Sequence, residues 1–123
     1  MDTERSHKDL IAWQKSIQLV TEVYKLTAKF PRSETYGLAS QMQRAATSIP
    51  SNIAEGRNRG TRKDFVQFLR IALGSATELE TQLIIATNLG YCDGAESTRA
   101  TNLLSEVCKM LHGMLKKLRF PDS

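Results

Sequence analysis

The sequence has no long hydrophobic run and little cysteine. No apolar segment approaches the roughly 20 residues that a membrane-spanning helix needs, and the opening MDTERSHKDL lacks the basic-then-apolar pattern of a secretory signal. We therefore expect a cytoplasmic protein without a membrane partner. The two cysteines, Cys92 and Cys108, have no CxxC spacing, which favours two reduced thiols over a disulfide or a zinc site.

Motifs for catalysis or for cofactor binding are absent as well. The chain has no Glu-x-x-His pair of the kind that di-iron helical bundles use, and its two histidines, His7 and His112, stand alone. It also has no Gly-x-Ser-x-Gly turn and no Walker loop, so no nucleophile or phosphate cradle can be named from a motif. We expect no metal site, no cofactor and no enzymatic activity.

What is present is typical of one all-helical domain. The 123 residues are 41% hydrophobic and 24% charged, which is enough to bury one core without disulfides or metals. No segment alternates with a period of two, so we expect no strands. Apolar residues recur instead every three or four positions in four segments. Over residues 1–123 we predict a single all-α domain.

Two of the predicted helices lie in the first half of the chain. Residues 10–30 form the first, which Pro31 stops. Residues 38–55 continue the pattern in a second helix, in which Pro50 falls on the outer side, off the apolar centre. We expect Pro50 to kink this helix rather than end it, and Gly56 to begin its exit. The spacing predicts a core face on the first helix formed by Leu10, Trp13, Ile17, Val20, Tyr24 and Thr27.

The third predicted helix has the strongest apolar pattern. It opens on a capping box formed by Thr61 and Asp64 and runs to Gly90, which permits a left-handed exit. A second box-like pair, Asp93 and Glu96, starts a fourth helix of similar length. Because short connections make successive helices antiparallel neighbours, we predict an up-down-up-down four-helix bundle.

A polar stripe accompanies the apolar stripe of the second helix. The third helix carries Ser75, Glu78 and Gln82 on one flank, so the two polar rows can pair, with Arg44 and Glu78 as the expected ion pair. Unpartnered buried polar groups cost roughly 1 to 3 kcal/mol each, so we interpret these rows as a structural polar seam that fixes the helix register. The alternative is a substrate site with Glu55 as its base. The predicted seam consists of Gln41, Arg44, Ser48, Asn52, Glu55 and Glu78.

Residues 57–63, RNRGTRK, are the strongest candidate for a binding surface. They join two helices and carry four cations, Arg57, Arg59, Arg62 and Lys63, which we call the basic turn. They also precede a helix N-terminus, where free amides and the helix dipole favour anions. Without interleaved aromatic residues, such a turn would contact the backbone of RNA or DNA with strong salt dependence and little sequence preference. The alternative is a solvated turn without a ligand.

The third helix has more apolar surface than one core face needs. Leu73 and Ile84 lie about 80 to 100 degrees round from that face, and Ile71 and Ile85 lie farther off. Gly74, opposite the core face, would let the backbone of a partner approach closely. We predict that Leu73, Gly74, Ile84 and Ile85 form a self-association interface; the alternative is that a neighbouring helix of the same bundle covers this surface.

Several stretches together resemble one known family. They are HKDLIAW at 7–13, QMQRAATSIPSNIAEG at 41–56, DFVQFLRIALGSATELETQL at 64–83 and LGY at 89–91. In them the chain resembles the four-helix-bundle proteins encoded by intervening sequences within bacterial 23S ribosomal RNA genes. The resemblance covers almost the whole chain, although the fourth helix matches only in general character. It implies a cytosolic bacterial bundle that assembles as a ring-like homo-oligomer, a pentamer, without an established activity.

The resemblance also bears on the roles of individual residues. It implies a structural role, and no catalytic one, for Gln41, Arg44, Ser48, Asn52, Glu55, Gly56, Gly74, Glu78 and Glu80. A similar, more distant group of accessory proteins binds nucleic acid through basic surfaces. Our leading hypothesis is therefore a non-catalytic, homo-oligomeric nucleic-acid-binding or accessory protein that contacts RNA or DNA phosphates. A protein-interaction or scaffold module is the alternative, and an uncharacterised enzyme with Glu55 beside Asn52 and Arg57 is the third.

Overall fold

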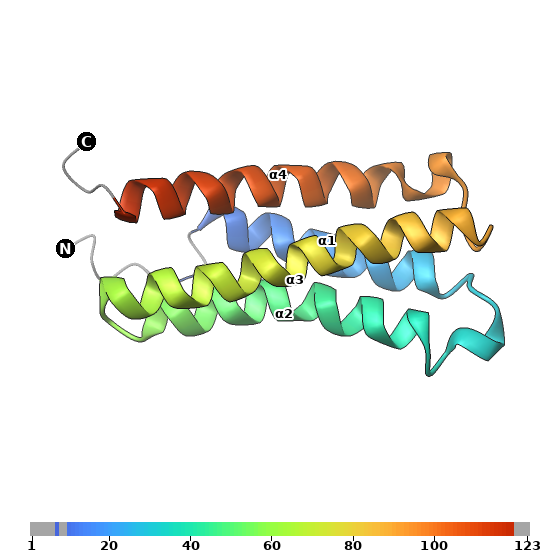
Figure 1. Ribbon diagram of the computed structural model, residues 1–123, viewed down its shortest axis with the longest axis horizontal. Coiled ribbons are helices and arrows are strands. Elements are labelled where there is room, and N and C mark those ends of the chain that lie inside the picture. Colours follow the sequence, from blue (N-terminus) through green and yellow to red (C-terminus); the bar gives the residue numbers. More distant parts are fainter. Residues whose placement is uncertain (1–6, 8–9, 120–123) are drawn as a thin grey trace.

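The computed structural model describes residues 7 and 10–119, and this part of the chain is helical throughout its length apart from short connections (Figure 1). It contains the helices α1 (Ile11–Thr27), α2 (Leu38–Asn58), α3 (Arg62–Asn88) and α4 (Gly94–Arg119), with a short 3-10 helix, η3 (Arg32–Glu34), between the first two. No strand occurs in these residues, which confirms the predicted all-α fold. None of the helices described is long and apolar enough to cross a bilayer.

The helices form a bundle in which each one contacts two others. Both α1 and α3 pack against α2 and α4, whereas the backbones of the diagonal pairs do not come close anywhere between residues 10 and 119. In Figure 1 the chain runs along α1, returns along α2, and repeats this path in α3 and α4. The α2–α3 turn and the last turns of α4 therefore lie at the same end of the bundle.

The predicted capping residues set the starts of α3 and α4. The Asp64 N–H donates to Thr61 Oγ1 at 3.1 Å. At the start of α4 the pairing is reciprocal: the Asp93 N–H donates to Glu96 Oε1 at 3.0 Å, and the Glu96 N–H donates to Asp93 Oδ1 at 2.7 Å. These bonds satisfy first-turn amides that have no acceptor within the helix. Gly90, with a φ of 77°, takes the left-handed conformation expected after α3.

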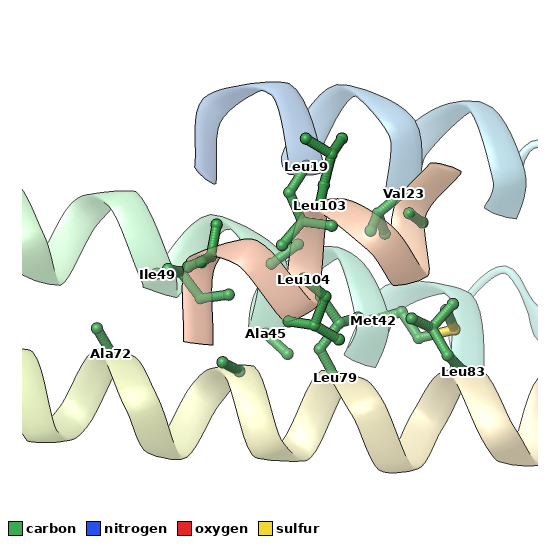
Figure 2. Close-up of a cluster of buried hydrophobic side chains, with 14 of the residues drawn as sticks. Leu19, Val23, Met42, Ala45, Ile49, Ala72, Leu79, Leu83, Leu103 and Leu104 are labelled. Atoms are coloured by element: carbon green, nitrogen blue, oxygen red, sulfur yellow. The ribbon is translucent and has the colours of Figure 1, made fainter. Parts of the chain in front are cut away.

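One aliphatic core occupies the centre of the bundle. Figure 2 shows side chains from all four helices pointing into it. Burying a leucine or isoleucine side chain contributes about 1.5–3 kcal/mol, so this cluster is the main source of stability. Its members labelled in Figure 2 are Leu19, Val23, Met42, Ala45, Ile49, Ala72, Leu79, Leu83, Leu103 and Leu104.

The core face of α1 differs from the predicted one. Ile17 and Tyr24 are exposed, while the buried face lies about one residue step, or 100°, round the helix. It was missed because it contains the small, polar Ser16, which hydrophobic spacing does not select. The Ser16 hydroxyl donates to the Trp13 carbonyl at 2.7 Å, so it can be buried without an unpaired polar group. The buried residues of α1 are Ala12, Ser16, Leu19, Val23, Leu26 and Thr27.

Helix α2 continues through Pro50 and ends later than predicted. The bend at Pro50 stays a prediction, and the outward position predicted for this proline is wrong, because Pro50 is buried. The exit predicted at Gly56 is also wrong: Gly56 lies inside the helix, which runs on to Asn58. A Cβ at Gly56 would lie 2.6 Å from the Phe68 Cβ and 3.2 Å from the Phe65 ring. This glycine therefore lets α2 and α3 approach closely, rather than ending α2.

Candidate functional site

The basic turn lies where α2 passes into α3, at one end of the bundle (Figure 1). Arg57 belongs to the last turn of α2, and Arg59 is the residue that caps it. Gly60, with a φ of 91°, reverses the chain in a conformation that other residues rarely adopt. Arg62 and Lys63 then begin α3. The short connection thus brings cations from the ends of two helices together.

A single cation of the basic turn has a carboxylate partner. Arg59 Nε donates to Glu55 Oε2 at 2.9 Å, and both side chains are about half exposed, at 51% and 54%. No carboxylate of the described residues lies within 4 Å of the other three cations of the turn. Between residues 55 and 64, four cations stand against Glu55 and Asp64, which leaves a net charge of +2. An exposed ion pair contributes at most about 1 kcal/mol, so Glu55 neutralises Arg59 only weakly.

Two arginines of the turn lie against aromatic rings of α3. The Arg57 Cζ is 5.9 Å from the centroid of the Phe65 ring, and the Arg59 Cζ is 5.1 Å from that of Phe68. Residues 57–63 contain no aromatic residue, as the sequence indicates, but the fold places two aromatic rings of α3 against the turn. The rings come eight and nine positions after their arginines, beyond the turn, and the sequence gives no direct signal for these contacts.

The end of α4 brings further positive charge to this end of the bundle. Lys116 and Lys117 are exposed and belong to its last turns. Figure 1 places those turns at the same end as the α2–α3 connection. The sequence alone does not relate these lysines to the basic turn, because they lie more than 50 positions after it and only the packing of the helices brings the two segments to one end.

Part of the predicted polar seam forms between α2 and α3. Ser48 Oγ and Ser75 Oγ lie 2.8 Å apart and share a hydrogen bond across the two helices. Asn52 Nδ2 donates to Ser48 Oγ at 2.9 Å and to the Ser48 carbonyl at 2.7 Å. Further along α3, Gln82 Nε2 donates to Glu78 Oε2 at 3.3 Å. The Ser48–Ser75 hydrogen bond therefore joins the two rows, whereas the bonds of Asn52 and Gln82 lie within α2 and within α3.

The long charged side chains of the predicted seam behave differently. Arg44 and Glu78 are both exposed, and neither makes an ion pair within 4 Å among the described residues, so this predicted pair is wrong. Together with Gln41 they line a small polar pocket of about 170 Å³. Glu55 pairs with Arg59 and not with a residue of α3 among those described. Exposed charges gain little from pairing across a seam and keep their hydration instead. An exposed Glu55 held by Arg59 also gives no support to its use as a catalytic base.

The predicted interface residues of α3 divide into exposed and half-buried ones. Ile84 is 58% exposed, Ile71 45% and Ile85 41%, and a Cβ added at Gly74 would meet nothing within 4 Å. Leu73, by contrast, is partly buried against the core. The exposed apolar surface of α3 therefore includes Ile71 in addition to three of the four predicted positions.

A groove of about 620 Å³ lies along the α3–α4 contact, and Cys108 lines it. Leu83, Ile84 and Leu104 line it together with Cys108. Burial raises the pKa of the Cys108 thiol, and the charge of Glu80 raises this pKa further. The thiol is therefore protonated at neutral pH and unsuited to nucleophilic attack. Residues 7 and 10–119 contain no group of three or more His, Cys, Asp or Glu side chains that could hold a metal ion.

The opposite end of the bundle has a polar contact that the sequence did not suggest. The Tyr91 hydroxyl donates to Glu34 Oε2 at 2.8 Å, and the Leu38 N–H donates to Glu34 Oε1 at 3.0 Å. The bond from the Leu38 N–H, and then the bond from Tyr91, lower the pKa of Glu34. Tyr91 also packs on Phe30, with ring centroids 5.4 Å apart. This contact joins the connection before α2 to the one before α4.

Comparison with known proteins finds one family and a solved structure. The model of the family described as 23S rRNA-intervening sequence protein matches residues 8–113, which include both the seam and the basic turn. A protein with unknown function from the S23 ribosomal protein family of Bacteroides thetaiotaomicron has a similar crystal structure, with a TM-score of 0.78 and 27% identity. The likeness covers 86% of this chain and 99% of that one. No match was found among curated proteins.

Proposed function

Because the chain belongs to the family of 23S rRNA-intervening sequence proteins, we propose that it is a non-catalytic, cytoplasmic protein that binds structured RNA or DNA through its basic turn. The observation that carries this proposal is the cluster of four cations at one bundle end: Arg59, Arg62 and Lys63 are exposed, Arg57 is half-buried, and only Arg59 has a carboxylate partner among the described residues. Unpaired, exposed cations are available to phosphates and release counterions when they bind them.

The position of the cluster favours anions for a second reason. Arg62 and Lys63 stand in the first turn of α3, a helix of 27 residues whose amides and dipole create a positive potential at this end. The last turns of α4, which carry Lys116 and Lys117, lie at the same end of the bundle and add positive charge there. A surface of this kind recognises the charge and spacing of phosphates rather than the edges of bases.

Binding to a labelled RNA hairpin, measured by fluorescence anisotropy at low salt, tests the proposal. Replacing the four cations of the basic turn by alanine should weaken binding at least tenfold. A matched control replaces four cations elsewhere, Lys25, Lys29, Arg32 and Arg99, and so changes the net charge equally. If wild-type protein does not bind at low salt, or if both variants lose affinity equally, the basic turn is not the binding site.

We propose as a second function that the protein associates with copies of itself, as the pentamer that the family resemblance implies. The supporting observation is the exposure of Ile71, Ile84 and Ile85 beside the open position at Gly74. Several exposed isoleucines on one helix form apolar surface of the kind that marks protein–protein contacts. The solution mass, measured by light scattering during size exclusion, tests this function independently of any nucleic acid.

A further inference from the structure

The four cations of the basic turn differ in how their side chains are held. Arg57 and Arg59 lie over phenylalanine rings, at 5.9 and 5.1 Å, whereas no such ring contact occurs at Arg62 or Lys63 among the described residues. The side chain of Arg59 is also fixed at its edge, because its Nε donates to Glu55 at 2.9 Å. This arginine is therefore held both by a ring contact and by an ion pair.

The rings reach the arginines because α2 and α3 lie unusually close at this point. Gly56 stands one residue before Arg57, and the Cβ that it lacks would lie 2.6 Å from the Phe68 Cβ. Phe65 is buried and Phe68 is half-buried, so both rings are anchored in the packing between the helices. The close approach of the two helices thus places a rigid aromatic support beneath two flexible side chains.

The guanidinium carbon of Arg59 lies 5.1 Å from the centroid of the Phe68 ring, so the ring supports this group from one side. The Arg59 side chain is also half exposed, which leaves part of it accessible to a ligand. Guanidinium planes stack on nucleic-acid bases, an interaction that the compact ammonium group of lysine does not offer. Because the side chain is already held, less conformational entropy is lost when a base stacks on it.

We propose that Arg57 and Arg59 form a stacking platform for unpaired bases, so that the preferred ligand is a nucleic acid with single-stranded or loop segments. This inference rests on the proposed function and names its ligand class. Bases inside a duplex are stacked on one another and do not present a face, whereas unpaired bases do. Arg62 and Lys63 then contact phosphates, and the two arginines add a contribution that depends on the presence of bases.

Two single-stranded probes of equal charge separate these contributions. One is a labelled twelve-nucleotide oligodeoxyadenylate. The other has the same sugar-phosphate backbone but an abasic site at every position, so that all the adenine bases are missing. Stacking of one base is worth about tenfold in affinity, so wild-type protein should bind the first probe at least tenfold more tightly. Arg59→Lys keeps the positive charge but replaces the planar guanidinium, which can stack on a base, by an ammonium group. This variant should therefore lose most of the preference for the probe with bases. Arg62→Lys is the matched control and should preserve it.

The outcomes distinguish the inference from the function on which it rests. Equal binding of both probes by wild-type protein, or an equal effect of Arg59→Lys on both, would overturn the stacking platform and leave phosphate binding intact. Failure to bind either probe or the RNA hairpin at low salt would overturn the proposed function and the platform together. Because Arg59 is exposed, its replacement should not alter the helical circular dichroism of the protein, which checks that the variant is folded.

Discussion

Adding one methyl group at Gly56 should destabilise the bundle, because this position has no room for a Cβ. The added Cβ would lie 2.6 Å from the Phe68 Cβ, closer than real Cβ atoms come to one another, and 3.2 Å from the Phe65 ring. The Phe68 Cβ is attached directly to the backbone of α3, so it cannot move aside by rotating a side chain. Relief requires α2 and α3 to separate locally or to shift.

Two opposing effects determine the size of the change. Overpacking of this kind costs about 1–3 kcal/mol or somewhat more. Replacing glycine by alanine inside a helix stabilises it by about 1 kcal/mol. A contact this short belongs at the upper end of the first range, so we expect Gly56→Ala to lower the free energy of unfolding by about 2 kcal/mol. For a domain of this size that corresponds to a fall of several degrees in Tm.

Gly74→Ala is the matched control for this variant. Gly74 also lies inside a helix, but nothing would come within 4 Å of its added Cβ, so only the propensity gain remains. In dilute solution Gly74→Ala should raise the free energy of unfolding by about 1 kcal/mol. Urea unfolding followed by circular dichroism at 222 nm measures both variants. A Gly56→Ala protein as stable as the wild type would refute the close-packing argument.

Three further predictions concern charge, pH and assembly. If each of the four cations of the basic turn contacts one phosphate of a duplex, a plot of log affinity against log salt concentration should have a slope of about −3.6. Replacing the four cations by alanine should make this slope shallower. Tyr91→Phe should lower the urea midpoint at pH 7, because it removes the hydrogen bond to the charged Glu34 carboxylate. The difference in midpoint between this variant and the wild type should vanish as the pH falls through the lowered pKa of Glu34, since protonation removes the charged acceptor. A difference that stays constant with pH would contradict this linkage. Ile85→Glu should reduce the solution mass, whereas Asn102→Glu, on an exposed position of α4, should not; equal masses for all proteins would contradict the α3 interface.

Most of the fold could be predicted from the sequence because local signals determine it. The capping box of Asp93 and Glu96 forms as a reciprocal pair of hydrogen bonds, and Thr61 caps α3. Such signals act within four residues, so they do not depend on the rest of the molecule. The core face of α1 was harder to predict, because two adjacent stripes have the same spacing. Only contact with neighbouring helices selects the stripe that contains Ser16.

The candidate site could be predicted only in its composition. The cations of the turn are evident in the sequence, but their surroundings arise from packing between helices. The pairing of Arg44 with Glu78 was predicted from matching rows, yet exposed side chains gain too little from such a bond to be held in it. Glu55 pairs with Arg59, the residue that caps α2 four positions further along the chain, where the helical backbone brings the two side chains together.

Gly56 connects the stability of the bundle to the chemistry of its basic end. In sequence it resembles a helix terminator, because glycine after a helical pattern is commonly the residue of exit. In the structure its missing side chain brings α3 against α2, and this contact places Phe65 and Phe68 beneath Arg57 and Arg59. The packing that stabilises the two helices therefore also orders two of the cations. A larger residue at this position would separate the rings from the arginines as well as the helices from each other, so the arrangement of the basic turn depends on the absence of one methyl group.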